Sequence, residues 1–594
     1  MSIAALSALD DLGRLSRTVM HLRPGQVGQR IRLRAQRMAL EHSVPLARRW
    51  LLAGPYGPAG RDRAAGAGWP ETGWPHGFTP LDAELWSDAQ AGAALRAGKP
   101  SLIGASLAIA PSKDGRSANW ACADWAAAGA PLLWRFHLYY WDWAWALAHE
   151  RGNRAARSLF AEIWASWHAA VTPGRGPAWR TYPAALRAWS FCGIYRALVL
   201  GSRIQDPFLA ELAVHARFLR RNLETDVGGN HLMKNLKALA GLGVFFADDA
   251  LLASALGRLD KQISVQVLPD GGHYERAPAY HCQVLGDLID IAGLLRGVGS
   301  AVPAALTEAI AAMRGWLGAV LTPSGDVPML NDGFPVSRTL LAALAPSAPP
   351  AGPLHVLPDT GLAVITAGGW RVLADIGPPC PPELPAHAHA DSLSCVVHVD
   401  AEPLLIDTGT STYAQCAMRD RERSTAAHNT LEVDGCDSTE VWGAFRAGRR
   451  ARVSAVHAAG DGDTVTVEAA HDGYRSLAGK PVHHRRWSVT AGELRVDDTV
   501  TGRRRHRITL RWHLLPGAGL RLIPGGAVVT TAAGEIGVAV TASCEQVLTC
   551  GTAPVSAGFG STVQAPVLTC TLHCELPVRI STAWRRAEAR KEST

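Results

Sequence analysis

Asn230 and His231 form the first candidate site, because an amide and an imidazole stand at the predicted start of an apolar helix. They lie in the stretch Gly228-Gly-Asn-His-Leu-Met-Lys-Asn235, and apolar residues continue at helical spacing as far as Phe246. An asparagine at this position ordinarily caps the helix. A helix N-terminus also favours a bound carboxylate, because its free N–H groups carry partial positive charge. Both roles, capping and binding of an anionic ligand, fit Asn230.

The second candidate is a segment dense in polar and aromatic side chains, Asp270-Gly-Gly-His-Tyr-Glu-Arg-Ala-Pro-Ala-Tyr-His281. It opens with an Asp-Gly turn and precedes a predicted helix, Val284–Leu295, so the segment is expected to pack against the fold. Burial of so many polar groups is costly unless they are used. We therefore interpret this segment as functional.

Residues of the second half of the chain supply possible metal ligands. Pro385-Ala-His387-Ala-His389 contains two histidines one residue apart, and on a β-strand such a pair points to one face. Asp407 ends an apolar run, and His428 follows it. His389, Asp407 and His428 would offer two imidazoles and a carboxylate, a set that suits Zn²⁺ with water in the fourth position. A hydrogen-bonded Asp–His pair without metal is the alternative.

The elements that must position these residues change period along the chain. Residues 85–345 show successive helical patterns, such as Ala155–Ala169 and Ala304–Leu321, which indicate a toroid of paired helices or a solenoid. After the Pro-rich linker at 345–353, apolar residues alternate with period two, which predicts an antiparallel β-sandwich over 353–594. Residues 1–84 are predicted to form leading helices and then a Gly/Pro-rich irregular arm at 54–75.

Size and composition fit a soluble multidomain protein, since 594 residues exceed what one core supports and 47% of them are hydrophobic. The net charge of +7 suits an acidic substrate but shows no clustered basic surface for nucleic acid. The 11 cysteines form no CxxC pair, which favours reduced thiols. We recognise neither a signal peptide nor an apolar run of transmembrane length. A cytoplasmic protein is expected, without nucleic acid or a membrane as partner.

Taken in order, these motifs resemble the heparinase II/III family. The resemblance covers residues 125–450 most strongly. It rests on the following stretches: Trp134-Arg-Phe-His-Leu-Tyr-Tyr-Trp-Asp-Trp143, Trp179-Arg-Thr-Tyr-Pro-Ala-Ala-Leu-Arg187, Asn230-His231 with Asn235, Asp270 to His281, His387-Ala-His389-Ala-Asp391, Asp407-Thr-Gly-Thr and Ser424-Thr-Ala-Ala-His428-Asn429-Thr.

The resemblance implies an α + β multidomain fold, an incomplete (α/α) toroid followed by an antiparallel β-sandwich, with the active site in the cleft between them. It implies a polysaccharide lyase in which Asn230 contacts the substrate carboxylate while Tyr280 and His387 handle protons. His389, Asp407 and His428 would match the positions that hold a mainly structural zinc in some members. Members of the family degrade heparin, heparan sulfate or alginate, and a self-made capsule or exopolysaccharide is an equally good substrate here, because no export signal is seen.

This chemistry explains the residue types. The C5 proton of a uronic acid is only weakly acidic, and amide donors that hold the adjacent carboxylate stabilise the enolate as it forms. A tyrosine, with a reference pKa of about 10, is a poor base unless positive neighbours lower its pKa. It can then take the C5 proton and return one to the C4 oxygen, and His387 is the alternative base. Expected binders of anionic groups are His231, Arg276, His281, Arg187 and Arg135.

Three other functions remain compatible with the sequence. A glycoside hydrolase would use a pair of carboxylates such as Asp270 and Glu275, or Glu275 and Asp391. A β-sandwich oxygenase would bind iron through His387, His389 and His428. A non-catalytic glycan-binding or assembly protein would not depend on the Tyr280 hydroxyl.

Overall fold

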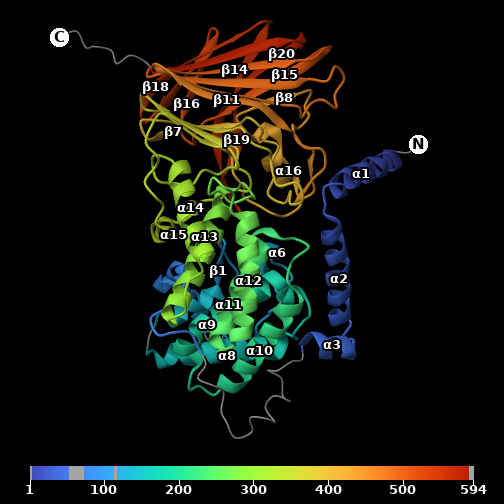
Figure 1. The fold of residues 1–594 in the computed structure, drawn as a ribbon, viewed down its shortest axis with the longest axis vertical. Coiled ribbons are helices and arrows are strands. Elements are labelled where there is room, and N and C mark those ends of the chain that lie inside the picture. The colour runs from blue at the N-terminus through green and yellow to red at the C-terminus, as the bar shows by residue number, and fades with distance from the viewer. Residues whose placement is uncertain (1–2, 53–72, 113–116, 151, 587–594) are drawn as a thin grey trace, which may run out of the picture.

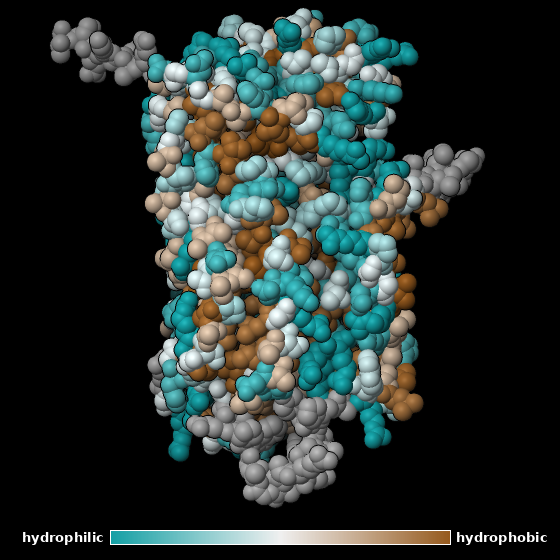
Figure 2. Space-filling view, in the orientation of Figure 1, coloured by the Kyte–Doolittle hydropathy of each residue, from teal (hydrophilic) through white to brown (hydrophobic). Residues whose placement is uncertain are grey.

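The computed structural model describes residues 3–52, 73–112, 117–150 and 152–586. Three leading helices, α1 (Ile3–Val19), α2 (Pro24–Glu41) and α3 (Pro45–Leu52), run along one side of the molecule and span both of its halves (Figure 1). We call this segment, residues 3–52, the N-terminal arm. Apolar side chains show along the outer edge of the molecule over α2 and α3 (Figure 2). The Gly/Pro-rich stretch predicted as irregular lies outside the described residues except at its last three positions.

The helical half of the chain packs around a large apolar core rich in tryptophan. Helices α9, α11 and α13 are neighbours, and α14 packs against α13. Helix α11 is buried on nearly every side, and from Leu236 to Phe245 its sequence is apolar except for Lys237, which is the pattern of a central helix. The helices of this half are α5 (Ala89–Arg96), α6 (Leu132–Tyr140), α7 (Trp145–Ala148), α8 (Arg154–Ala170), α9 (Thr181–Ile194), α10 (Gln205–Arg221), α11 (Gly229–Phe245), α12 (Asp249–Gln266), α13 (Pro278–Gly297), α14 (Ala304–Val320) and α15 (Arg338–Leu344).

Most strands of the described C-terminal half belong to three antiparallel sheets. The first has the order β3-β4-β5-β6-β7, the second β19-β20-β15-β8, and the third β11-β12-β13-β14-β21-β18-β17-β16. Their bounds are β3 (Leu354–Leu357), β4 (Leu362–Ala367), β5 (Trp370–Asp375), β6 (Cys395–Val399), β7 (Glu402–Leu405), β8 (Leu431–Val433), β11 (Val453–Asp461), β12 (Thr464–His471), β13 (Val482–Val489), β14 (Glu493–Thr501), β15 (Arg505–His513), β16 (Gly519–Ile523), β17 (Gly526–Thr531), β18 (Gly534–Ala542), β19 (Gln546–Gly558), β20 (Ser561–Glu575) and β21 (Val578–Arg586).

The first sheet joins the two halves, because both of its faces are buried. Side chains alternate along β4: Ala363 and Ile365 belong to the core of the sandwich, whereas Leu362 and Val364 pack with Trp316 of α14. This second contact fixes the sandwich on the end of the helical domain. The loops that connect β5 to β6 and β7 to β8, the latter containing the short helix α16 (Ala417–Arg423), therefore lie over that end.

No helix in the described part of the chain combines the length and apolar character needed to cross a lipid bilayer.

Candidate active site

Tyr280 lies where the helical domain meets the sandwich. Pro278 occupies the first turn of α13, where its missing N–H costs no hydrogen bond, and Tyr280 follows within that turn. The ring of Tyr280 lies over the imidazole of His387, with centroids 3.9 Å apart and planes inclined by 31°. Both side chains are buried. A phenol of one domain and an imidazole of the other are thus in direct contact.

Glu275 connects this pair to Asn230. Its Oε2 accepts a hydrogen bond from Asn230 Nδ2 at 2.9 Å and lies 3.2 Å from His387 Nε2, while Oε1 accepts from the Asn230 backbone N–H at 2.7 Å. Burial alone would raise the pKa of Glu275, but His387, His273 and the Asn230 N–H outweigh burial and lower this pKa to about 2. Glu275 is therefore a carboxylate at neutral pH, and it organises the amide and the imidazole around itself.

The start of α11 explains how Asn230 approaches Glu275 so closely. Gly228 and Gly229 both have positive φ, 74° and 56°, and a Cβ at Gly229 would overlap the Glu275 carboxylate. Gly228 is the cap residue, so Asn230 lies inside the helix and does not cap it with its side chain. Its Oδ1 is buried without a hydrogen-bond partner among the described residues. The capping role that the sequence allowed is absent, and the amide faces the site.

His387 and His389 are not on a β-strand, contrary to the expectation from their spacing. They lie in the loop between β5 and β6, where backbone turns replace the pleat. Both imidazoles nevertheless meet one carboxylate, because His387 Nδ1 lies 2.9 Å from Asp332 Oδ2 and His389 Nε2 lies 2.9 Å from Asp332 Oδ1. Arg419 of α16 forms a two-pronged ion pair with the same carboxylate. Against the effect of burial, Asp332 and Glu275 raise the pKa of His387 to about 9.

Tyr413 is a site residue to which sequence reasoning gave no role. Its hydroxyl lies 2.7 Å from the hydroxyl of Tyr280. The guanidinium of Arg419 stands over its ring, 5.1 Å from the centroid. Burial first, and then Tyr413 and Asp332, raise the pKa of Tyr280 well above its usual value. Burial likewise raises the pKa of Tyr413, so both tyrosines are neutral phenols that share a hydrogen bond.

The side of the site toward solvent is formed by His231 and Tyr182. The two rings lie 4.3 Å apart, and the His231 side chain is 38% exposed. His231 Nδ1 lies 3.2 Å from Glu224 Oε1. Burial opposes a charge on His231, but Glu224 outweighs burial and raises the pKa of His231. His231 thus places a positive charge next to Asn230 in the sequence, on the exposed side of the site.

Four predicted substrate binders are used elsewhere in the fold. Arg187 is fully buried and donates to the carbonyls of Tyr139 and Ala178, so it is a structural residue of the helical core. His281 has both ring nitrogens engaged, Nδ1 by the His273 N–H and Nε2 by the Met313 carbonyl.

Arg276 and Arg135 also lack a contact with the site residues in the described structure. Arg276 donates to the Thr360 carbonyl at the junction of the domains. Arg135 lies on α6, and its Nε is buried without a partner among the described residues. A residue next to a site residue in the sequence need not reach the site. Neighbours on a helix, such as Tyr280 and His281, point in directions about 100° apart.

The three predicted metal ligands lie near one another. The rings of His389 and His428 are 5.2 Å apart, and His428 Nδ1 lies 2.8 Å from Asp407 Oδ2. His389 Nδ1 and His428 Nε2 are both buried without partners among the described residues, which fits donors that await a ligand. Among these same residues, however, no three His, Cys, Asp or Glu side chains stand close enough together to hold a metal ion as they are. Zinc binding stays a prediction.

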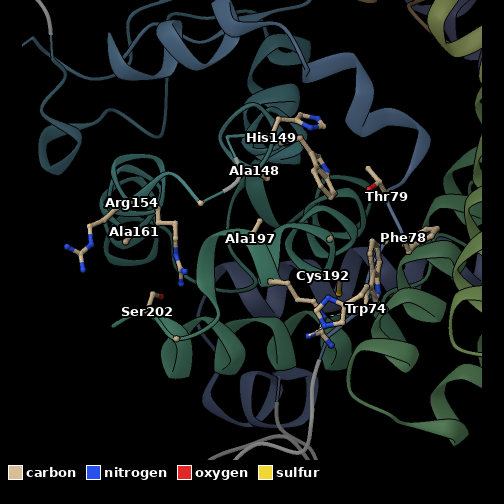
Figure 3. Close-up of a pocket in the computed structure, with 18 of the residues that line it drawn as sticks. Trp74, Phe78, Thr79, Ala148, His149, Arg154, Ala161, Cys192, Ala197 and Ser202 are labelled. Atoms are coloured by element: carbon tan, nitrogen blue, oxygen red, sulfur yellow. Dashed lines mark hydrogen bonds between the residues drawn. The ribbon is translucent and has the colours of Figure 1, made fainter.

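A prominent cavity of the described structure is elsewhere. It measures about 1040 Å³ and is lined by residues of the helical domain that include Trp74, His149, Arg154 and Ser202 (Figure 3). None of Asn230, Tyr280 and His387 lines it. The side chains of these three residues are instead buried where the two domains meet, and their chemistry, not the size of a cavity, marks the site.

Comparison with known proteins identifies the family. Residues 112–347 match the model described as heparinase II/III N-terminus, and residues 349–580 match heparinase II/III-like, C-terminal. The chain therefore belongs to the heparinase II/III family, as the motifs predicted, and it is a polysaccharide lyase. A search of curated protein sequences finds no matching relative.

Solved structures confirm the predicted fold class. The structure of a heparinase III superposes with a TM-score of 0.72 at 16% identity, covering 87% of this chain and 86% of that one. The heparan sulfate lyase HepC from Pedobacter heparinus gives 0.58 at 15% identity, with 86% and 84% covered. The chondroitin AC lyase of Streptomyces coelicolor, solved with chondroitin sulphate, gives 0.51 at 14% identity, with 91% and 83% covered.

Proposed function

We propose that this lyase cleaves a uronic-acid-containing polysaccharide by β-elimination at the site of Asn230, Tyr280 and His387. One observation carries the proposal: an amide from α11 and an imidazole from the sandwich share a single carboxylate, Glu275, and a phenol from α13 lies against that imidazole. Elimination at a uronate needs a group that binds the carboxylate, a group that moves protons and a positive charge near the developing enolate. These three residue types supply them.

Asn230 and His231 are the residues we assign to the uronate carboxylate. The Asn230 amide donates to Glu275, and an incoming uronate carboxylate takes over one of these N–H donors. His231 stands at the exposed edge of the site with a raised pKa, and its charge offsets that of the uronate. Held in this way, the carboxylate can accept the charge that develops when the C5–H bond breaks.

Tyr280 is the residue we assign to proton transfer. It acts as the phenolate: after its own proton has left to solvent, it takes the C5 proton and passes it to the C4 oxygen as the C4–O bond breaks. Tyr280 thus ends as the phenolate again, no water is consumed and a 4,5 double bond forms. The charge on the neighbouring imidazole of His387 stabilises the phenolate. Tyr413 raises the pKa of Tyr280 while Tyr280 donates to it, and it stabilises the phenolate once its own hydroxyl donates instead. A single residue can serve both steps when the C5 proton and the C4 oxygen lie on one face of the sugar. For the opposite C5 configuration, His387 is the alternative base, in its neutral form, which its raised pKa of about 9 favours only at alkaline pH.

The pair Asp270 and Glu275 gives the hydrolase alternative no support. Asp270 accepts hydrogen bonds from the backbone N–H and the hydroxyl of Thr360, at 2.7 and 2.8 Å, and is thereby committed to the domain junction. Glu275 is held by Asn230 and His387. A hydrolase needs two carboxyl groups that face each other across a bond.

The test is an ultraviolet assay for the unsaturated uronate product with a panel of polysaccharides. The panel contains heparan sulfate, chondroitin sulfate, alginate and bacterial capsular or exopolysaccharides, so that both C5 configurations are present. We expect absorbance to rise with at least one member, and Tyr280→Phe to lower kcat by about 10²–10⁴-fold. Tyr195→Phe, at a buried tyrosine of the helical core, is the matched control. Cleavage that yields reducing ends without the absorbance would show a hydrolase instead.

We also propose that His389, Asp407 and His428 hold a structural zinc ion. Two unpartnered imidazole nitrogens and a nearby carboxylate support this set, since zinc accepts such ligands in structural sites. Metal analysis of the purified protein should find zinc, and His428→Ala should remove it. Chelation should lower the melting temperature, which is a readout independent of activity. A metal-free protein whose melting temperature does not respond to added zinc would contradict the site.

A further inference from the structure

The N-terminal arm concentrates nearly all of the protein's net charge. Residues 1–52 contain nine arginines, no lysine and three acidic residues, which gives +6 of the +7 formal charge of the whole chain. The remaining residues are thus almost neutral overall. Any long-range attraction of an anionic surface acts on this segment first.

The arm also exposes an unusual amount of apolar surface. Ten of the 21 exposed large apolar side chains in the described residues belong to it, although it makes up less than a tenth of the chain. Ile31 is 66% exposed, Met38 55%, Leu46 79% and Trp50 58%. Large apolar groups gathered in this way mark an interaction surface.

On α2 the apolar and cationic residues share one face. Val27, Ile31, Arg34 and Met38 follow the spacing i, i+4, i+7 and i+11, which places them in a single stripe. All four are exposed. The face that contacts the body is different, with Leu33 and Leu40 buried in it.

The contacts that attach the arm to the two domains leave this stripe exposed to solvent in the described structure. Arg17 of α1 pairs with Glu440 of the sandwich, with Nε 2.8 Å from Oε2, and Arg30 of α2 lies 3.7 Å from Asp226 of the helical domain. The arginines beside the apolar residues are not used in this way. Arg34, Arg48 and Arg49 have no carboxylate within ion-pair distance in the described part of the chain.

We propose that the N-terminal arm binds the surface of an anionic lipid bilayer, with α2 and α3 lying in the headgroup region. Helices with an apolar stripe flanked by arginine bind such surfaces, because the apolar side chains enter the acyl boundary while guanidinium groups reach lipid phosphates. Each arginine near an anionic leaflet adds to the attraction. The expectation that no membrane is a partner considered spanning segments, and a surface helix needs none.

Two other occupants fit the arm less well. A second copy of the arm would bring +6 against +6, and like charges oppose that contact. A soluble acidic polysaccharide would pair with the arginines but has no use for Ile31, Met38 and Leu46. An indole face can stack on a sugar ring, but one face of Trp50 is already covered by Arg221, whose Cζ lies 5.4 Å from the ring centroid. Only a surface both anionic and apolar uses the whole stripe.

Sedimentation of the full-length protein with vesicles tests this proposal. Vesicles of equal parts phosphatidylglycerol and phosphatidylcholine should retain the protein at low salt and release much of it at high salt, whereas pure phosphatidylcholine should bind it weakly. The charge variant Arg34→Gln/Arg48→Gln/Arg49→Gln should lower partitioning by about 100-fold. The apolar variant Ile31→Gln/Met38→Gln/Leu46→Gln should lower it by about tenfold or more.

The matched control is Arg521→Gln/Leu522→Gln/Ile523→Gln on β16, which removes exposed residues of the same kinds from the sandwich and should bind like the wild type. Three results would overturn the proposal: no binding of the wild type to anionic vesicles, equal binding of wild type and both arm variants, or a concentration-dependent dimer in sedimentation velocity that the apolar variant abolishes while vesicle binding is absent. Lyase activity on soluble substrate should be unchanged in all of these variants, so the result is independent of the proposed function.

Discussion

The hydroxyl of Tyr280 lies 2.7 Å from that of Tyr413, although the first tyrosine belongs to α13 and the second to the sandwich. Each domain therefore contributes one phenol to a shared hydrogen bond. If Tyr280 passes through a phenolate, Tyr413 donates to it and stabilises the charge. A hydrogen bond of this kind stabilises the transition state of the reaction more than the complex with bound substrate.

Tyr413→Phe should accordingly lower kcat by about 10–100-fold with little change in KM, because it removes one neutral hydrogen bond to a developing charge. Steady-state kinetics by the ultraviolet assay measures both constants. The melting temperature should change little, since the ring and its packing against Phe445 and Phe559 remain. A variant with wild-type kcat would show that the contact only holds the domains together.

Gly229→Ala should both destabilise the protein and abolish lyase activity, because only glycine fits at this position of the backbone. Gly229 has φ 56°, and a Cβ there would overlap the Glu275 carboxylate that Asn230 and His387 both contact. We expect a loss of about 2–4 kcal/mol in the free energy of unfolding, together with loss of activity as Glu275 is displaced. Chemical unfolding and the lyase assay measure the two effects. Gly257→Ala in α12, where an added Cβ meets nothing within 4 Å, is the control and should be neutral or stabilising. Equal behaviour of the two variants would contradict the close approach.

Glu224→Gln should lower the pH above which KM begins to rise. Glu224 raises the pKa of His231, so the imidazolium persists above its ordinary pKa and is lost only as pH rises through the raised value. Removing the carboxylate lowers that pKa, and uronate binding should then weaken at a lower pH than in the wild type. At acid pH, where His231 is charged in both proteins, the KM values should converge. The check is KM as a function of pH for the two proteins, and superimposable profiles would exclude His231 from carboxylate binding.

The sequence predicted the fold well because its two periods are strong. Helical spacing in the first half and alternation after residue 353 each follow from one face being buried, and the helices expected at Ala155–Ala169 and Ala304–Leu321 correspond to α8 and α14. The spacing of His387 and His389 predicts a strand, although both lie in the loop between β5 and β6, because two histidines with one residue between them match the strand period by chance. Two residues are too few to establish a period.

The site was predicted in part. Asn230, Tyr280 and His387, widely separated in sequence, are brought together, but the partners that hold them were not foreseen. Asp332 stands in an Asn-Asp-Gly turn that resembles any surface turn. Only the folded structure shows that it is completely buried and that its carboxylate contacts two histidines and Arg419. Which side chain of a helix faces a second domain depends on packing between distant segments, and a single sequence contains no direct record of that contact.

Asp498→Asn should destabilise the sandwich strongly. Arg485 and Asp498 are both fully buried on neighbouring strands β13 and β14, with Arg485 Nε 2.7 Å from Asp498 Oδ1 and His483 Nε2 2.6 Å from the same oxygen. Burial opposes the charge of Asp498, but Arg485 and His483 outweigh burial and lower its pKa to about 2. Removing the carboxylate leaves the guanidinium buried without its counter-charge, which costs about 3–5 kcal/mol at neutral pH.

The pH dependence of this loss follows from the sign of the pKa shift. A carboxylate whose pKa is lowered by folding stabilises the native state above its unfolded pKa of about 3.9, and this stabilisation disappears as pH falls toward its folded pKa. The difference in unfolding free energy between wild type and Asp498→Asn should therefore be largest above about pH 4 and shrink below it. Denaturant titrations from neutral to acid pH measure that difference. Asp497→Asn, at the half-buried neighbour on β14, is the control and should cost less than about 1 kcal/mol throughout. A difference that does not depend on pH would show that shape, and not charge, makes Asp498 necessary.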